Sequence, residues 1–331
     1  MPWKGEKDPY KIWLSEVILQ QTRVEQGLGY YQRFVQQYPT IKDLAAAKDE
    51  EVYKLWEGLG YYSRCRNLLA TARIIVNEKG GKFPGTYDEI LQLKGVGPYI
   101  ASAVASFAYN LPYAVLDGNV FRVLSRVYGI ETPIDSTQGK KQFTSIAHEN
   151  LDQKNAAEYN QAIMDFGATV CKPMVPSCSS CPMKKICMAF KNGLVNHLPV
   201  KEKVLQKKLR WLYYFLFEVD EKHLVHQRTG KDIWQNLYEF YPFESPEQID
   251  WDEKKLKAWL QDQFGVKSYK LKQISEVMSQ QLTHQKIKGQ FFSIQLKAIP
   301  KPLEHYQWVT NKELQKLAFP KFINLYLESK R

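Results

Sequence analysis

Acidic residues, cysteines and long apolar runs are all scarce in this chain of 331 residues. Asp and Glu number 35 against 46 Lys and Arg, and the formal net charge of +11 favours a polyanionic partner, either nucleic acid or an acidic membrane face. No apolar run approaches the roughly 18 residues of a spanning helix, and residues 1–13 show no signal-peptide core. We therefore expect a soluble cytoplasmic protein with nucleic acid as its partner.

Cysteine occurs five times, but four of these residues fall within residues 171–187. A reducing cytosol disfavours disulfides, so cysteines clustered in this way indicate a metal site. The sequence also lacks internal repeats and low-complexity tracts. Its length and its hydrophobic content of 44% are sufficient for at least two packed domains, which argues against wholesale disorder.

Residues 9–195 have the pattern of a mainly helical region without convincing strands. Asp8 followed by Pro9 forms an N-cap and first-turn pair. Pro98 is placed to begin a later helix, and Asp117 is placed to cap the next one, which carries an apolar stripe.

The character of the chain changes in its second half. Residues 196–210 hold five Lys or Arg in their last ten positions, which predicts a solvated basic linker. Beyond it, segments rich in aromatic and β-branched residues predict strands with one helix between them. Thr310 and Glu313 have capping-box spacing before a C-terminal helix that Pro320 should break or kink. We expect a separate α/β domain over residues 211–331.

Four cysteines, Cys171, Cys178, Cys181 and Cys187, form a C-x6-C-x2-C-x5-C pattern. Four thiolates so close in sequence can converge on one metal centre, either zinc or an iron–sulfur cluster, and the spacing does not distinguish the two. Cys65 stands apart and is predicted to be an ordinary thiol. Several lysines near the pattern face either solvent or a phosphate backbone: Lys172, Lys184, Lys185 and Lys191.

Gly95 and Gly97 lie in a short turn between two predicted helices. Such a turn exposes backbone N–H groups beside a helix N-terminus and suits one phosphate, although an ordinary helix–helix turn has the same pattern. Asp117, which follows Tyr99 by 18 positions, also has two interpretations, a plain helix cap or a functional carboxylate.

Glu16 lies among apolar residues in the segment 12–19. On an amphipathic helix it would face water. As a buried acid it would have a pKa raised by desolvation, which suits a proton donor. Glu16 and Asp117 would then form an acid and charge-stabiliser pair, but spacing does not establish that they meet.

Five motifs occur in an order that resembles one family. They are SEVILQQT around Glu16, GLGYYSR at 58–64, LKGVGPY at 93–99, LDGNV at 116–120 and the cysteine pattern. Together they resemble the MutY-type adenine DNA glycosylases of the helix-hairpin-helix superfamily. The resemblance covers nearly all of residues 1–195. It implies a mainly α catalytic region there, a [4Fe–4S] cluster in the loop 171–187, and excision of adenine opposite 8-oxoguanine in base excision repair.

The resemblance also implies roles for individual residues. Glu16 matches the acid that protonates adenine at N7, and Asp117 matches the carboxylate that stabilises the oxocarbenium-like sugar. Asn119 and Tyr99 match residues that support this charge and the water. The remaining matches contact DNA: Gln21 and Tyr61 as wedges in the base stack beside the flipped adenine, and Gly95 and Gly97 as the phosphate-binding hairpin.

Tyr99 also indicates a subclass. Related endonuclease III-type enzymes carry a lysine at this place, whose amine forms a Schiff base and then cuts the strand. Tyrosine cannot do this, so we predict a monofunctional glycosylase. The alternatives are an endonuclease III-type glycosylase/lyase, a non-catalytic iron–sulfur DNA-binding sensor, which leaves Glu16 and Asp117 without a task, and a Nudix hydrolase with a helical appendage.

The second half resembles the family's Nudix-like domain, most clearly at residues 228–240. Where the family's recognition loop reads Phe-Ser-His, this chain has Leu282, Thr283 and His284, which keep the hydroxyl and the imidazole. No run of paired glutamates and arginine for magnesium is present, so this domain should read a base and not cleave a nucleotide. The implied partner is double-stranded DNA with an adenine:8-oxoguanine mispair, bound by a monomer at the nucleoid.

Overall fold

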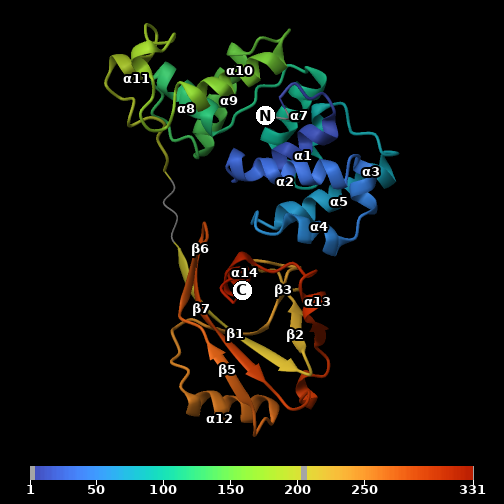
Figure 1. Ribbon diagram of the computed structural model, residues 1–331. Coiled ribbons are helices and arrows are strands. Elements are labelled where there is room, and N and C mark those ends of the chain that lie inside the picture. The colour runs from blue at the N-terminus through green and yellow to red at the C-terminus, as the bar shows by residue number, and fades with distance from the viewer. Residues whose placement is uncertain (1–3, 203–206, 331) are drawn as a thin grey trace. The chain divides into compact units, whose positions relative to one another are not determined.

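A computed structural model describes residues 4–202 and 207–330 of the chain (Figure 1). Contacts divide these residues into two compact units. The first unit comprises residues 4–46 and 66–202, and the second comprises residues 47–65 and 207–330. Within the described residues, no helix is both long enough and apolar enough to cross a membrane.

The first unit is helical, and residues 4–202 contain no strand. Its first helix begins as predicted, because the Asp8 side chain accepts a hydrogen bond of 2.9 Å from the Tyr10 amide. The helices are α1 (Pro9–Leu19), α2 (Val24–Gln37), α3 (Ile41–Ala46), α5 (Ser63–Glu78), whose first turn belongs to the second unit, α6 (Tyr87–Leu91), α7 (Pro98–Tyr109), α8 (Gly118–Tyr128), α9 (Thr137–Asn150), α10 (Ala156–Thr169) and α11 (Met188–Lys191).

Helix α1 is enclosed by its neighbours, which explains why it is apolar on nearly all sides. Trp13, Leu14 and Ile18 are at most 1% exposed, and α1 packs against both α2 and α7. The apolar stripe of α8 packs in a second core around Phe143 of α9. The helix ends at Gly129, which adopts a left-handed conformation. These two cores hold α1, α7 and α8 in fixed positions within the first unit.

The second unit contains a mixed sheet of eight strands. The hydrogen-bonded order is β3-β2-β1-β7-β5, with β4 beside β1, β6 beside β7, and β8 beside β2. Only the β1–β7 pair among these is parallel. The elements are α4 (Asp49–Trp56), β1 (Lys208–Val219), β2 (Lys222–Gln227), β3 (Tyr238–Glu239), β4 (Tyr241–Ser245), α12 (Glu253–Phe264), β5 (Lys270–Ile274), β6 (Met278–Gln281), β7 (Gln285–Gln295), β8 (Gln307–Thr310), α13 (Asn311–Leu314) and α14 (Lys321–Glu328).

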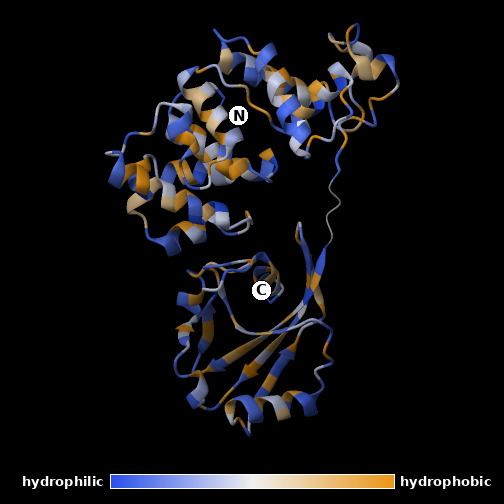
Figure 2. Ribbon diagram, turned by 180° about the vertical axis from the view of Figure 1, so that it is seen from behind, coloured by the Kyte–Doolittle hydropathy of each residue, from blue (hydrophilic) through white to orange (hydrophobic). Residues whose placement is uncertain are grey.

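Both faces of the sheet are covered by helices. Phe215 of β1 stacks on Trp259 of α12, with ring centroids 4.2 Å apart. Phe291 of β7 stacks on Tyr326 of α14 at 4.1 Å, and its neighbour Phe292 contacts Phe215 on the α12 side. Successive strand residues face opposite sides, so β1 and β7 are apolar on both. Figure 2 shows hydrophobic and hydrophilic residues mixed along α12, whose buried side faces the sheet.

The C-terminal helices follow the prediction. Thr310 and Glu313 form both hydrogen bonds of a capping box at the start of α13. The chain then leaves the helical conformation and α14 begins after Pro320. A single helix was therefore correctly expected to be interrupted at this proline.

The predicted solvated linker, residues 196–210, is wrong at its C-terminal end. Strand β1 begins at Lys208, and Arg210 is only 7% exposed. The Arg210 guanidinium is compensated by ion pairs with Asp232 and Glu244, which allow a charged residue to be buried in a strand. Part of the predicted linker, residues 203–206, lies outside the described residues.

Candidate active site

Glu16 lies in the middle of α1 and is 7% exposed. Burial raises the pKa of its carboxyl from 4.5 to about 7, a hydrogen bond from Tyr99 opposes this shift, and the charge of Asp117 adds to it. The interpretation of Glu16 as a water-facing residue is therefore wrong, because neighbouring helices cover its side of α1. An acid with this pKa is partly protonated at neutral pH and can donate a proton.

Tyr99 reaches Glu16 from the first turn of α7. Its hydroxyl donates a hydrogen bond of 2.7 Å to Glu16 Oε2. Burial, together with the nearby carboxylates, raises the pKa of Tyr99 well above its usual value, so the phenol remains a proton-bearing donor. Gly97 at the N-cap and Pro98 in the first turn fix the helix start that places this side chain.

Asp117 has the capping role that the sequence predicted, and its second carboxyl oxygen makes a further contact. It caps α8, because its Oδ1 accepts a hydrogen bond of 2.7 Å from the Val120 amide. Its Oδ2 accepts a second bond of 2.6 Å from Asn119 Nδ2. Burial raises the pKa of Asp117, although these hydrogen bonds act in the opposite direction. The structure thus brings Asp117 and Asn119 together and places the Asp117 charge close enough to influence Glu16.

Sequence reasoning missed Arg122, a buried residue of α8. Its Nη2 donates to Asn119 Oδ1 at 2.9 Å and to the Gly167 carbonyl at 2.7 Å. Its Nε donates at 2.7 Å to the carbonyl of Cys171. A chain of hydrogen bonds therefore connects Asp117, through Asn119 and Arg122, to the first cysteine of the cluster pattern. The available signal was an arginine one helical turn after Asn119.

The four clustered cysteines are free and partly buried, whereas Cys65, predicted as an ordinary core or surface thiol, lies in the core. Arg126 Nη1 lies 3.4 Å from Cys171 Sγ. Burial and the other three cluster thiols raise the pKa of Cys178, so all four cysteines share one neighbourhood. No three His, Cys, Asp or Glu side chains in the described ranges form a site for a single metal ion. The lysines of this segment are exposed, which permits contact with either solvent or phosphate.

The turn containing Gly95 and Gly97 has the conformation expected of an exposed glycine turn. Gly95 has φ +79°, and a Cβ there would lie 2.6 Å from the Asn67 Cβ. Gly97 provides no side-chain cap, so it covers none of the first amides of α7. Thr71 Oγ1 holds the turn by donating to the Lys94 carbonyl at 2.8 Å. This arrangement can accept one anion at the start of a helix.

Gln21 and Tyr61 share an unusual backbone conformation, each within its own unit. Gln21 follows α1 with φ +58°, and Tyr61 follows α4 with φ +48°. Both side chains are exposed, and Tyr61 is 42% exposed. The guanidinium of Arg64 lies 5.5 Å from the Tyr61 ring centroid. Left-handed backbone at a non-glycine residue is costly and is typical of functional sites.

The three residues Leu282, Thr283 and His284 form the turn between β6 and β7. The Leu282 amide donates to the Gln285 carbonyl at 2.8 Å, which closes the turn. Thr283 is partly exposed and His284 is exposed. Within the second unit, the Thr283 hydroxyl hydrogen-bonds the Tyr61 hydroxyl.

Both halves of the chain are similar to known proteins. Two family models match, "HhH-GPD superfamily base excision DNA repair protein" over residues 14–149 and "NUDIX domain" over residues 213–329. An adenine DNA glycosylase of Buchnera aphidicola subsp. Acyrthosiphon pisum (strain APS) is 35% identical over 250 residues, which cover 75% of this chain and 71% of the relative. The Homo sapiens adenine DNA glycosylase is 44% identical over 198 residues, 57% of this chain and 36% of the relative. A solved thermostable thymine-DNA glycosylase is 29% identical, with a TM-score of 0.54 over 58% of this chain and 88% of that chain.

Proposed function

Because the chain belongs to the family of adenine DNA glycosylases, we propose that it is a monofunctional enzyme that hydrolyses the N-glycosidic bond of adenine paired with 8-oxoguanine or guanine. The observation that carries this proposal is the arrangement of two carboxyls in different environments, Glu16 and Asp117, with Tyr99 bound to the first. We assign catalysis to residues 1–195 and lesion recognition to residues 211–331.

Glu16 acts as the general acid. Its pKa of about 7 leaves a substantial protonated fraction at neutral pH, and the Tyr99 hydroxyl fixes one carboxyl oxygen. Protonation of adenine at N7 converts the base into a neutral leaving group as the bond to the sugar breaks. Burial supplies the raised pKa, and the packing of α1 supplies the burial.

Asp117 stabilises the positive charge that develops on the sugar. Burial raises the pKa of Asp117, and hydrogen bonds from Val120 and Asn119 oppose this shift by favouring the ionised form. One carboxyl therefore supplies a proton while the other supplies negative charge. Asn119 holds Asp117 and supports the water that attacks the sugar. Tyr99 carries no amine, so the reaction ends at the abasic site.

The DNA-binding residues lie on exposed turns. Gly95 and Gly97 offer backbone amides to a phosphate, and the side chains of Gln21 and Tyr61 fill the base stack when adenine is flipped out. Thr283 and His284 contact the base opposite the adenine. The substrate is double-stranded DNA with an adenine:8-oxoguanine mispair, bound by a monomeric protein in the cytoplasm, at the nucleoid.

The four clustered cysteines fit a [4Fe–4S] cluster, because they are free, partly buried thiols in one loop, and the sulfur of the first lies 3.4 Å from the Arg126 guanidinium. Cys171, Cys178, Cys181 and Cys187 would hold it, and when bound it would supply the fold of the loop 171–187. We expect Cys178→Ser to lower the iron content of the purified protein, while Cys65→Ala leaves it unchanged. Equal iron in both variants would contradict this assignment.

A duplex with one adenine opposite 8-oxoguanine tests the proposed reaction. After incubation with the protein, half of the sample is treated with hot alkali, which breaks the strand at any abasic site. We expect scission only after alkali, with a rate lowered about 10²- to 10⁴-fold in Glu16→Gln. Glu25→Gln, an exposed acid on α2, is the control and should retain activity. Scission without alkali would identify a lyase instead, and duplex binding without base release would identify a non-catalytic sensor.

A further inference from the structure

The turn of the β6–β7 hairpin is held by hydrogen bonds to backbone carbonyls from two sides. Gln285 uses its carbonyl oxygen to accept from the Leu282 amide at 2.8 Å and from Gln281 Nε2 at 2.9 Å. The neighbouring strand β1 adds a third bond, in which the Lys208 amide donates to the His284 carbonyl at 3.0 Å. The orientation of the Gln285 peptide therefore determines how the turn is closed.

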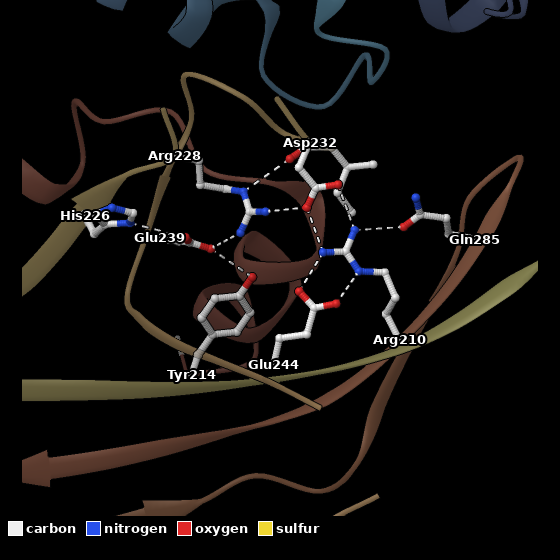
Figure 3. A network of polar contacts seen from close by, with 9 residues as sticks. Arg210, Tyr214, His226, Arg228, Asp232, Glu239, Glu244 and Gln285 are labelled. Atoms are coloured by element: carbon white, nitrogen blue, oxygen red, sulfur yellow. Dashed lines mark hydrogen bonds and ion pairs between the residues drawn. The ribbon is translucent and has the colours of Figure 1, made fainter. Parts of the chain in front are cut away.

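The side chain of Gln285 contacts a buried guanidinium. Arg210 Nη1 donates a hydrogen bond of 3.1 Å to Gln285 Oε1, and Arg210 is 7% exposed. Figure 3 shows Gln285 at one edge of the network, directed toward the Arg210 nitrogen Nη1, which also donates to Asp232. The first residue after His284 is thus connected to the interior of the second unit.

Two carboxylates fix the plane of the Arg210 guanidinium, so this group does not move with Gln285. Glu244 accepts from Nε and Nη2, both at 2.7 Å. Asp232 accepts from Nη1 at 2.9 Å and from Nη2 at 2.7 Å. Bidentate pairs of this kind fix orientation as well as charge. Gln285 is uncharged, so its contact does not help to neutralise Arg210. The contact instead holds the Gln285 side chain in position.

The network extends beyond Arg210 to a second guanidinium. Asp232 also accepts from Arg228 at 2.9 Å, and Arg228 donates to Glu239 at 2.5 Å. Glu239 is 2% exposed and further bonded to Tyr214. Residues of β1, β3, β4 and the segment 228–237 therefore form one network of ion pairs and hydrogen bonds, called the Arg210 centre below. Gln285 of the β6–β7 hairpin is hydrogen-bonded to this network.

We propose that Gln285 is a positioning residue for reading the base opposite the adenine, because it anchors the 282–284 turn to the Arg210 centre. This inference depends on the proposed function, in which Thr283 and His284 contact that base. The side-chain bond to Arg210 sets the Gln285 peptide, and the peptide carbonyl sets the closing bond to Leu282. The chain thereby keeps the turn in one conformation before DNA is bound.

Single-turnover rates on an adenine:8-oxoguanine duplex and an adenine:guanine duplex test the inference, because their ratio measures lesion discrimination. Gln285→Leu removes the acceptor for Arg210 and should lower the ratio about 2- to 10-fold, the range expected for one net hydrogen bond. Gln285→Glu keeps an acceptor and should retain the natural ratio within about twofold. Gln285 is half-buried, and both variants are compared by thermal unfolding, so that a loss of fold is separated from a loss of discrimination.

Thr283→Val distinguishes the inference from its premise. If Thr283→Val lowers the ratio and Gln285→Leu does not, the turn reads the lesion without help from Arg210, and the inference is wrong. Equal losses in Gln285→Leu and Gln285→Glu would also overturn it, because the acceptor would not matter. If neither Thr283→Val nor His284→Ala changes the ratio, the proposed reading of 8-oxoguanine by this turn fails, and the inference fails with it.

Discussion

The hydroxyl of Tyr99 donates a 2.7 Å hydrogen bond to the Glu16 carboxyl across 83 positions of sequence. Burial raises the pKa of Glu16, and this bond acts in the opposite direction by favouring the ionised carboxylate. The balance places the pKa at about 7. A general acid is most effective when its pKa is near the working pH, so in the proposed reaction the bond from Tyr99 would suit Glu16 to neutral conditions.

We predict that the rate of base release falls as the pH rises above about 7, because Glu16 must be protonated to donate. Tyr99→Phe removes the hydrogen bond that lowers the Glu16 pKa. The alkaline limb of the pH–rate profile, where the rate falls, should therefore shift to higher pH by about one pH unit. Single-turnover rates across pH give this limb directly. Tyr109→Phe, on the same helix, is the control and should leave it in place. An alkaline limb that shifts to lower pH in Tyr99→Phe would contradict the assignment of this limb to Glu16.

Glu16→Gln should lose activity and gain stability at alkaline pH. The folded-state pKa lies above the unfolded value of 4.5, so the folded protein binds more protons between pH 4.5 and about 7. Stability therefore falls as the pH rises through this window, by about 3 kcal/mol in total. Gln cannot ionise and avoids this loss. Urea unfolding should give similar free energies for both proteins below pH 4.5 and a more stable variant above pH 7; a constant difference across pH would contradict the buried acid.

Asp117→Asn should separate the capping role of this residue from its chemistry. Asn is as good an N-cap as Asp, so α8 and the thermal unfolding temperature should change little. The charge that stabilises the sugar is lost, and the single-turnover rate should fall about 10²- to 10³-fold. Asp252→Asn, at the N-cap of α12, preserves a cap elsewhere and should keep full activity. Full activity in Asp117→Asn would mean that Asp117 serves only as the N-cap of α8.

Gly95→Ala should weaken both the fold and DNA binding. The residue has φ +79°, and the new methyl group would meet the Asn67 Cβ, which cannot swing away as the end of a flexible side chain could. We expect a loss of about 1–3 kcal/mol in the free energy of unfolding and weaker duplex binding. Gly85→Ala, where a Cβ has no neighbour within 4 Å, serves as the control for urea unfolding and for the Kd. Unchanged duplex affinity in Gly95→Ala would contradict the proposal that this turn contacts DNA.

Local signals predicted most element boundaries well. Pro9, Pro98 and Pro320 each precede or begin a helix, and the capping box at Thr310 is formed. These features depend on a few neighbouring residues, so the sequence contains the information directly. The parallel β1–β7 pair was not predicted, because the register of two distant strands depends on the whole sheet.

The site was harder to read where tertiary burial reverses a local preference. Glu16 within an apolar segment is compatible with an exposed or a buried acid, and only the packing of α1 against α2 and α7 decides between them. Arg210 was predicted to be solvated because it ends a basic segment, whereas two distant carboxylates compensate its charge. Arg122 was overlooked because two of its partners, the carbonyls of Gly167 and Cys171, are distant in sequence.

The parallel pairing of β1 with β7 has a consequence for synthesis of the protein. Lys208 and Gln285 are register partners, so β1 must wait 285 − 208 = 77 residues for its neighbour to emerge from the ribosome. At about 5–20 residues per second this delay is roughly 4–15 s. During that time the edge of β1 that later pairs with β7 has no partner strand and is open to other nascent chains. Lys207 precedes this strand, Lys208 and Arg210 lie at its start ahead of the apolar residues 211–217, and like charges at the edge of such a segment oppose aggregation. We therefore expect the basic residues at the start of β1 to oppose aggregation of the growing chain, apart from the ion pairs that Arg210 makes in the folded one.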